Sequence, residues 1–143
     1  DGIFASFDDE NKIPCESEVI QKWGSWEAWQ EEMCQSWINK KLGEISEDQM
    51  LILDMQTNID FVLKALNTKD NIISKILLVT CGLDEMKKRL QKRGQPDLYN
   101  QDMVNWIQFL EKQANEKGIH IVNTQGVDVK YSVEDVKKEI YSL

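Results

Sequence analysis

Apolar residues follow two patterns along this chain: a helical spacing of three and four residues, and short continuous runs that are typical of buried strands. From Trp26 to Leu42 they are spaced three and four residues apart, which places them on one face of a helix. Ser25 is a favourable N-cap residue, and Gly43 is a favourable C-cap residue. The sequence therefore predicts a helix between these two residues, with a stripe containing three tryptophans packed on a sheet. A pocket lined by a tryptophan, Trp23 above all, is the alternative.

Further helices are predicted wherever the same spacing follows a residue that can cap a helix. They are residues 16–22 with Ser17 as cap, a helix through Leu66 with Thr57 or Asn58 as cap, residues 83–93, residues 100–117, and a last helix capped by Ser132.

Three short apolar runs predict buried strands: MLILD at 50–54, ILLVTC at 76–81 and IHIV at 119–122. None approaches the ~20 residues that a membrane-spanning helix needs. Strands that alternate with helices are typical of an α/β fold with a mainly parallel sheet. Three strands are few for so many helices, since about 5–6 are usual in a sheet. We therefore expect further sequence to precede Asp1.

Composition narrows the functional classes. The 143 residues fit a single domain, and their formal net charge of −8 disfavours nonspecific nucleic-acid binding. The three cysteines are scattered and the chain has one histidine, so a structural zinc site is not expected. With no visible signal peptide, the sequence fits a cytoplasmic protein with reduced, mostly buried thiols and no membrane partner.

Polar residues that follow the three predicted strands are the first candidates for a site. They lie at 54–56, 80–83 and 123–126. Because ligands bind outside the carboxyl ends of parallel strands, these segments are expected to converge on one edge of the sheet.

Asp54 ends the first of these strands. A carboxylate in this position can hold Mg²⁺ through water or accept a hydrogen bond from a phosphate-loop hydroxyl. An aspartate that merely caps the next helix is the alternative.

The tightest concentration of positive charge lies between Lys87 and Arg93, where five of seven residues are basic. Arg89 and Arg93 are four residues apart, so they share a helix face and can form a fork for phosphate oxygens. The break at 94–96 makes residues 94–102 a candidate lid. A solvated basic face that pairs with acidic surface is the alternative.

The segment Asn123-Thr124-Gln125-Gly126 closes the last strand. Its backbone and side-chain groups can bind the edge of a purine, although a plain turn explains the spacing equally well. His120, inside that strand, fits a packing role better than a catalytic one. No phosphate-cradling GxxxxGK[ST] segment is present in the 143 residues.

From Ile76 to the C-terminus, the chain resembles the C-terminal half of small P-loop kinases of the shikimate-kinase-like and nucleotide-kinase-like group. The segments that carry the resemblance are the strand followed by DEMKKRLQKRGQPDL, the strand ending IVNT, and SVEDVKKEI, with MLILDMQ similar to an earlier strand. The resemblance implies a three-layer α/β/α, P-loop NTPase-like fold. It also implies ATP-dependent phosphotransfer to a small hydroxyl- or phosphate-bearing substrate, such as a nucleoside or nucleotide.

The resemblance also assigns roles to particular residues. Arg89 and Arg93 would stabilise the transferring phosphoryl group, and Asp1 would face the acceptor. Asn123, Thr124 and Gln125 would lie beside the adenine of ATP, and Asp54 would assist Mg²⁺. The family's first strand and phosphate loop are missing from the chain, so we expect them ahead of Asp1. A non-catalytic module that binds a nucleotide or a partner protein is the alternative function, and an unrelated three-stranded α/β fold is a third interpretation.

Overall fold

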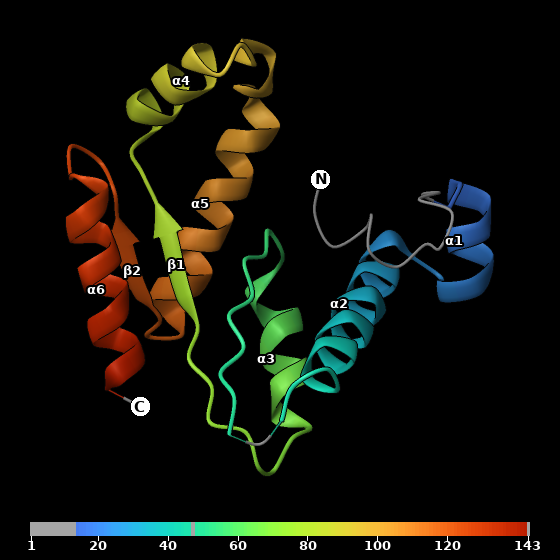
Figure 1. Ribbon diagram of the computed structural model, residues 1–143. Helices are drawn as coiled ribbons and strands as arrows, with labels where there is room; N and C mark the ends of the chain where they lie inside the picture. Colours follow the sequence, from blue (N-terminus) through green and yellow to red (C-terminus); the bar gives the residue numbers. More distant parts are fainter. Residues whose placement is uncertain (1–13, 47, 143) are drawn as a thin grey trace. The chain divides into compact units, whose positions relative to one another are not determined.

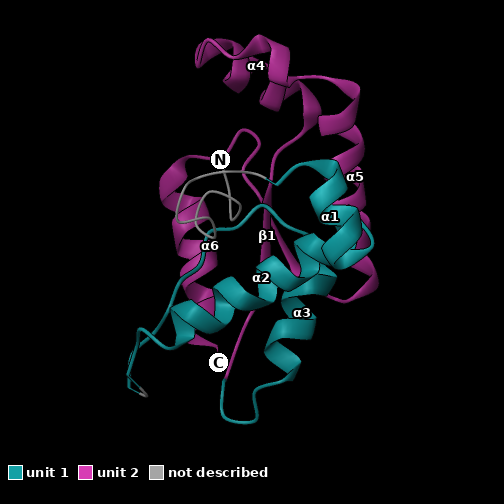
Figure 2. Ribbon diagram, turned by 90° about the vertical axis from the view of Figure 1, so that its right-hand side faces the viewer, with its two compact units in different colours: residues 1–72 teal, residues 73–143 magenta. Residues whose placement is uncertain are grey.

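The computed structural model describes residues 14–46 and 48–142. The chain divides into two compact units, residues 1–72 and 73–143, which Figure 2 colours separately. The helices of the first unit are α1 (Glu16–Trp23), α2 (Trp26–Leu42) and α3 (Ile59–Asn67). The second unit contains β1 (Leu77–Thr80), α4 (Leu83–Lys92), the 3-10 helix η2 (Pro96–Leu98), α5 (Gln101–Glu116), β2 (His120–Asn123) and α6 (Val129–Tyr141) (Figure 1).

The first unit is built around the contact between α2 and α3. Cys34 and Ile38 lie one turn apart on α2, and Phe61 and Ala65 lie one turn apart on α3. These four side chains are at most 3% exposed and form one apolar cluster. The i, i+4 spacing thus produces the buried face of each helix.

The predicted caps of α2 and α3 are confirmed. The Ser25 hydroxyl accepts a hydrogen bond from the Ala28 N–H at 3.1 Å. The Asn58 side chain accepts one from the Asp60 N–H at 2.9 Å. Each cap satisfies a donor that has no partner inside its own helix.

Three tryptophans of this unit pack against one another. Trp29 is buried, and the rings of Trp23 and Trp26 meet it edge-on at centroid distances of 6.5 and 5.2 Å. The Trp23 indole N–H donates to Glu32 at 2.9 Å. The stripe is therefore a packing surface, and its remaining tryptophan, Trp37, packs on the α2–α3 core. The sheet predicted as its partner is not found in the first unit, where α2 packs on α3 and the described residues form no strand.

The predicted strand at 50–54 is wrong. Residues 50–56 form no regular element, although their burial alternates as it does in a half-buried strand. Leu53 and Met55 pack on the α2–α3 core, while Ile52 is 73% exposed. An apolar run can bury alternate side chains against helices without pairing its backbone, so periodicity alone did not distinguish the two outcomes.

The second unit contains a parallel pair of strands. β1 and β2 pair with Leu77 opposite His120 and Thr80 opposite Asn123. α5 packs on both strands and α6 packs on β2. The connection through α4, η2 and α5 is the long crossover that parallel strands require (Figure 1).

The predicted three-layer α/β/α, P-loop NTPase-like fold is wrong. The described residues are mostly helical, and their only sheet has two strands, β1 and β2. The prediction counted 50–54 as a third strand and assumed that helices cover a wider sheet on both faces. Without that strand, the sheet is too small to form the central layer of such a fold.

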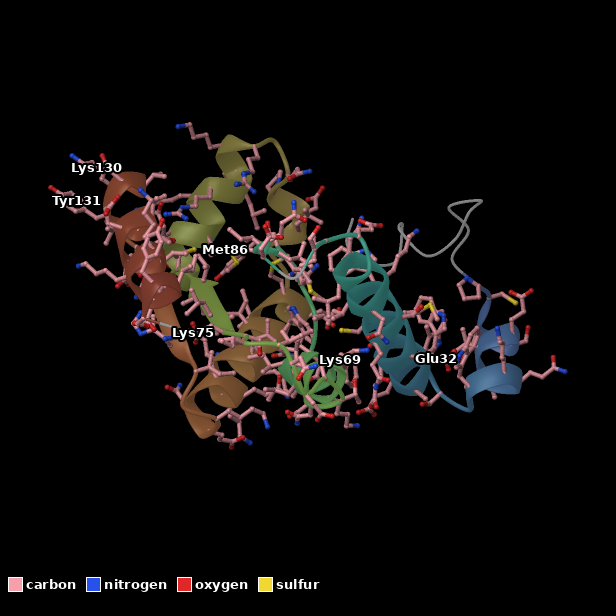
Figure 3. All side chains as sticks on the ribbon, turned by 60° about the horizontal axis from the view of Figure 1, so that its bottom comes forward. Glu32, Lys69, Lys75, Met86, Lys130 and Tyr131 are labelled. Carbon is pink, nitrogen blue, oxygen red and sulfur yellow. The ribbon has the colours of Figure 1, made fainter. Side chains whose placement is uncertain are left out.

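The last helix begins earlier than expected. Asp128, not Ser132, is the N-cap of α6, and its side chain accepts from the Lys130 N–H at 2.8 Å. Ser132 lies within the helix, where its hydroxyl is buried. Lys130 and Tyr131 project outward from the first turn (Figure 3). Aspartate is as good an N-cap as serine, so the choice between the two sites depended on tertiary packing.

Among the helices in the described ranges, none is long and apolar enough to cross a membrane.

Candidate functional site

The candidate site lies where the two parallel strands end. β1 ends at Thr80 and β2 at Asn123, on the same edge of the sheet. The Thr124 N–H donates to the Thr80 carbonyl at 2.8 Å, which extends the pairing one residue beyond β2. The loops after β1 and β2 are therefore held side by side, as predicted for these two of the three segments.

Arg89 of α4 connects its helix to the loop after β2. One guanidinium nitrogen donates to the Thr124 hydroxyl and another to the Thr124 carbonyl, both at 3.0 Å. Its Nε donates to Glu85, one turn earlier on α4, at 2.8 Å. Three of the five N–H groups of the guanidinium thus have protein partners.

The network continues from Thr124 into the sheet and onto α5. The Thr124 hydroxyl donates to the Thr80 carbonyl at 3.0 Å. The Thr80 hydroxyl in turn donates to Glu111 of α5 at 2.9 Å. Four segments therefore meet through side chains at this edge: α4, the loop after β2, β1 and α5.

Gly82 and Gln125 are in close contact beside this network. Gly82 is the N-cap of α4 and offers no side-chain oxygen to the first turn. A Cβ atom at this position would lie 1.9 Å from the Gln125 carboxamide oxygen. The carboxamide can therefore occupy the space next to the N-terminus of α4 only because residue 82 is glycine.

The loop that carries Gln125 is shaped by its own residues. The Asn123 side-chain oxygen accepts from the Gln125 N–H at 2.9 Å, a local contact that stabilises a turn. Gly126 has φ of 66°, in the left-handed region that glycine adopts without strain. Asn123, predicted to lie beside an adenine, thus has a defined role in the turn.

Arg93 differs from Arg89 although both arginines are on the predicted basic helix. It is the C-cap of α4 and is exposed. Within residues 14–46 and 48–142, no acidic group pairs with it, whereas Arg89 is bound to Glu85 and Thr124. The two arginines predicted to bind phosphate together therefore differ: Arg89 is hydrogen-bonded to protein groups, and Arg93 is exposed to solvent.

The predicted lid segment, residues 94–102, contains the 3-10 helix η2 and the start of α5. η2 occupies Pro96–Leu98, and α5 starts at Gln101 with the Asn100 side chain as its N-cap. Lys87 of α4 lies over the Tyr99 ring at 5.7 Å, which links the segment to the basic helix.

Two predicted site residues, Asp1 and Asp54, belong to the first unit. Asp54 is an exposed residue of the first unit, and Asp1 falls outside the described residues. No group of three or more His, Cys, Asp or Glu side chains within the described ranges is arranged to hold a metal. Within the described residues, Asp54 is therefore not part of a group of three or more side chains that could bind Mg²⁺.

Glu111 was missed by the sequence analysis. It lies 31 residues from Thr80 in the chain, near the middle of a helix that carries several other charged residues. Its contact depends on how α5 packs on β1, and no local pattern indicates it.

Comparisons of the chain with protein-family models, with curated proteins and with solved structures gave no match.

Proposed function

We propose that residues 73–143 bind a nucleotide, with ATP as the expected ligand, at the edge formed by Gly82, Arg89, Thr124 and Gln125. The observation that supports the proposal is the double hydrogen bond from Arg89 to Thr124. It brings together two residues that were predicted separately, one from a basic helix and one from a strand-end loop. Polar loops at the carboxyl ends of parallel strands are a common location for nucleotides.

The chemistry of the loop suits a purine base. The Gln125 carboxamide combines an acceptor oxygen with a two-proton donor, and the edge of adenine also presents both kinds of group. Gln125 is exposed, so a ligand can reach it. The backbone of Gly126 is adjacent and carries no side chain that would block a planar ring.

The basic residues suit the phosphates. Lys88, Lys92 and Arg93 are exposed on or next to α4, and within the described part of the chain none of them forms an ion pair. Unpaired cations on or next to the helix that Arg89 joins to this loop favour a ligand that carries negative charge. Arg93 is the residue we assign to the phosphate end of the nucleotide.

Nucleotide binding could be accompanied by phosphotransfer, and this part of the proposal rests on the resemblance to small kinases. The reaction would transfer the terminal phosphoryl group of ATP to a small hydroxyl- or phosphate-bearing substrate. It depends on positioning and charge stabilisation by a phosphate cradle and a metal. The 143 residues contain no GxxxxGK[ST] segment, so binding without turnover, the alternative function, is the form that the present residues support best.

Isothermal titration calorimetry with ATP, with and without Mg²⁺, tests the proposal directly. We expect saturable binding that weakens at least several-fold in Gln125→Ala and in Arg93→Ala. Lys138→Ala is the matched control, because it removes an exposed cation from α6, an element outside the proposed site. Inorganic triphosphate distinguishes binding of the base from binding of the phosphates.

The proposal is wrong if ATP produces no saturable heat at millimolar concentration. It is also wrong if Gln125→Ala and Arg93→Ala both bind ATP as tightly as the wild-type chain and the Lys138→Ala control.

A further inference from the structure

His120 lies between two carboxylates of one helix. Its side chain projects from β2 toward α6, where Nε2 is 3.3 Å from Oδ2 of Asp135. The other ring nitrogen, Nδ1, is 3.9 Å from Oε1 of Glu139. Asp135 and Glu139 are one turn apart on α6, so the ring faces both of them at once.

The charge of the ring decides how strongly this arrangement holds α6. Only the separation of Nε2 from Asp135 is within hydrogen-bond distance, and a neutral imidazole can make that bond by donating from Nε2. At 3.9 Å, the separation of Nδ1 from Glu139 is a charge–charge contact, which exists only when the ring carries a positive charge. The contact between β2 and α6 is thus stronger when the ring is protonated.

Lys75 fixes one side of the cluster. Its ammonium lies 2.5 Å from Oε2 of Glu139 and donates to the Ser142 hydroxyl at 3.1 Å. Through these two contacts, Lys75, which is labelled in Figure 3, reaches the C-terminal end of α6. The hydrogen bond from Lys75 to Glu139 holds the pKa of Glu139 below its usual range, so Glu139 is ionised throughout the range in which a histidine titrates.

The charged groups that face the ring are therefore Asp135 and Glu139 of α6, and Lys75, ahead of β1, is paired with Glu139. Among the described residues of α5, the other helix that packs on β2, none forms an ion pair with His120.

We propose that protonation of His120 strengthens the contact between α6 and β2, so that this contact is more stable at mildly acidic pH than at neutral or basic pH. The inference is independent of nucleotide binding. The effect is on α6, the C-terminal helix of the second unit, which Lys75 also links to the segment ahead of β1.

The chain offers an unusually clean test, because it contains one histidine. Between pH 5.5 and 8.0, histidine is the side chain whose ordinary pKa lies in the window. The α-amino group also titrates there, and a His120→Gln variant retains it. Any difference in pH dependence between the wild-type chain and this variant therefore reports on His120.

The experiment measures thermal unfolding and hydrogen exchange of the α6 amides at pH 5.5 and 8.0. On moving from pH 8.0 to 5.5, the wild-type midpoint should rise relative to that of His120→Gln by roughly 2 °C, since part-exposed ion pairs contribute little. Protection of the α6 amides, corrected for the intrinsic pH dependence of exchange, should rise at the same time.

Two further variants keep the test decisive if His120→Gln folds poorly. Asp135→Asn and Glu139→Gln each leave the histidine in place and should each reduce the pH-dependent gain. Glu134→Gln is the control, because this α6 residue pairs with Lys137 and not with the ring. Equal pH responses in the wild-type chain, Asp135→Asn and Glu139→Gln would overturn the proposal.

Discussion

Arg89 and Thr124, which are 35 residues apart in the chain, are joined by two hydrogen bonds of 3.0 Å, one to the hydroxyl and one to the carbonyl of the threonine. The pair joins the basic helix to the loop that closes the sheet. It is therefore a structural contact whether or not a ligand binds beside it.

Replacing Arg89 with alanine should lower the free energy of unfolding by about 1–2 kcal/mol. The change removes three charge-assisted hydrogen bonds, but the side chain is 41% exposed, so water compensates for part of the loss. Urea unfolding measures the difference. Arg93→Ala is the matched control and should change the stability by less than about 0.5 kcal/mol, because this arginine is exposed. Equal losses in the two variants would contradict the role assigned to Arg89.

Thr124→Val should destabilise the chain by about 1–2 kcal/mol, whereas Thr124→Ser should have a much smaller effect. Valine keeps the shape of threonine but removes the hydroxyl that accepts from Arg89 and donates to the Thr80 carbonyl. Serine keeps the hydroxyl. Urea unfolding of both variants is the measurement, and the reverse order of effects would show that the methyl group, not the hydroxyl, matters.

Much of the second unit could be predicted from the sequence, because its signals are local. The strand at 77–80, the helix from Leu83 and the helix after Asn100 follow from apolar period and capping residues. The parallel orientation of β1 and β2 agrees with the parallel sheet expected from the alternation of strands and helices. What failed depended on tertiary partners: the run at 50–54 found helices instead of a strand, and Asp128 was preferred over Ser132 as a cap.

The candidate site was predictable only in part, for the same reason. The strand-end loops and the arginine pair are visible in the sequence, and the structure brings Arg89 to Thr124. The difference between Arg89 and Arg93 is not visible, since it depends on Glu85 and Thr124 lying within reach of one arginine only.

Cys34 should resist thiol reagents while Cys15 reacts. Mostly buried thiols were expected from the sequence, but only Cys34 is buried, while Cys81 is half-buried and Cys15 exposed. Burial raises the pKa of the Cys34 thiol to about 11, an effect that a hydrogen bond with Thr57 only partly offsets. At pH 8 roughly one such thiol in a thousand is ionised. Ellman's reagent at pH 8 should therefore label Cys15 first, and Cys15→Ser should remove the fastest phase. Prompt labelling of Cys34 in the native chain would contradict its burial.

The ion pair between Lys75 and Glu139 should make stability depend on pH in the acidic range. Lys75 lowers the pKa of Glu139, so the stabilisation is fully present above the ordinary glutamate pKa of about 4.3 and is lost as the pH falls through the lower folded value. Glu139→Gln should thus be less stable than the wild-type chain at pH 7, and the two should converge near pH 3. Thermal unfolding at several pH values measures this. A constant difference down to pH 3 would point to lost packing instead of lost charge.

The parallel register of β1 and β2 also governs when this unit can assemble. Leu77 pairs with His120, so a connection of about 40 residues must close before any ladder hydrogen bond forms. Its closure costs about 3 kcal/mol of chain entropy, and such distant pairings form slowly. On a ribosome, α4 and its cations emerge well before β2, so the helix exists first without the loop that Arg89 binds. A nascent chain that ends before Ile119 therefore carries Gly82, Arg89 and every cation of α4, but it lacks Thr124 and Gln125.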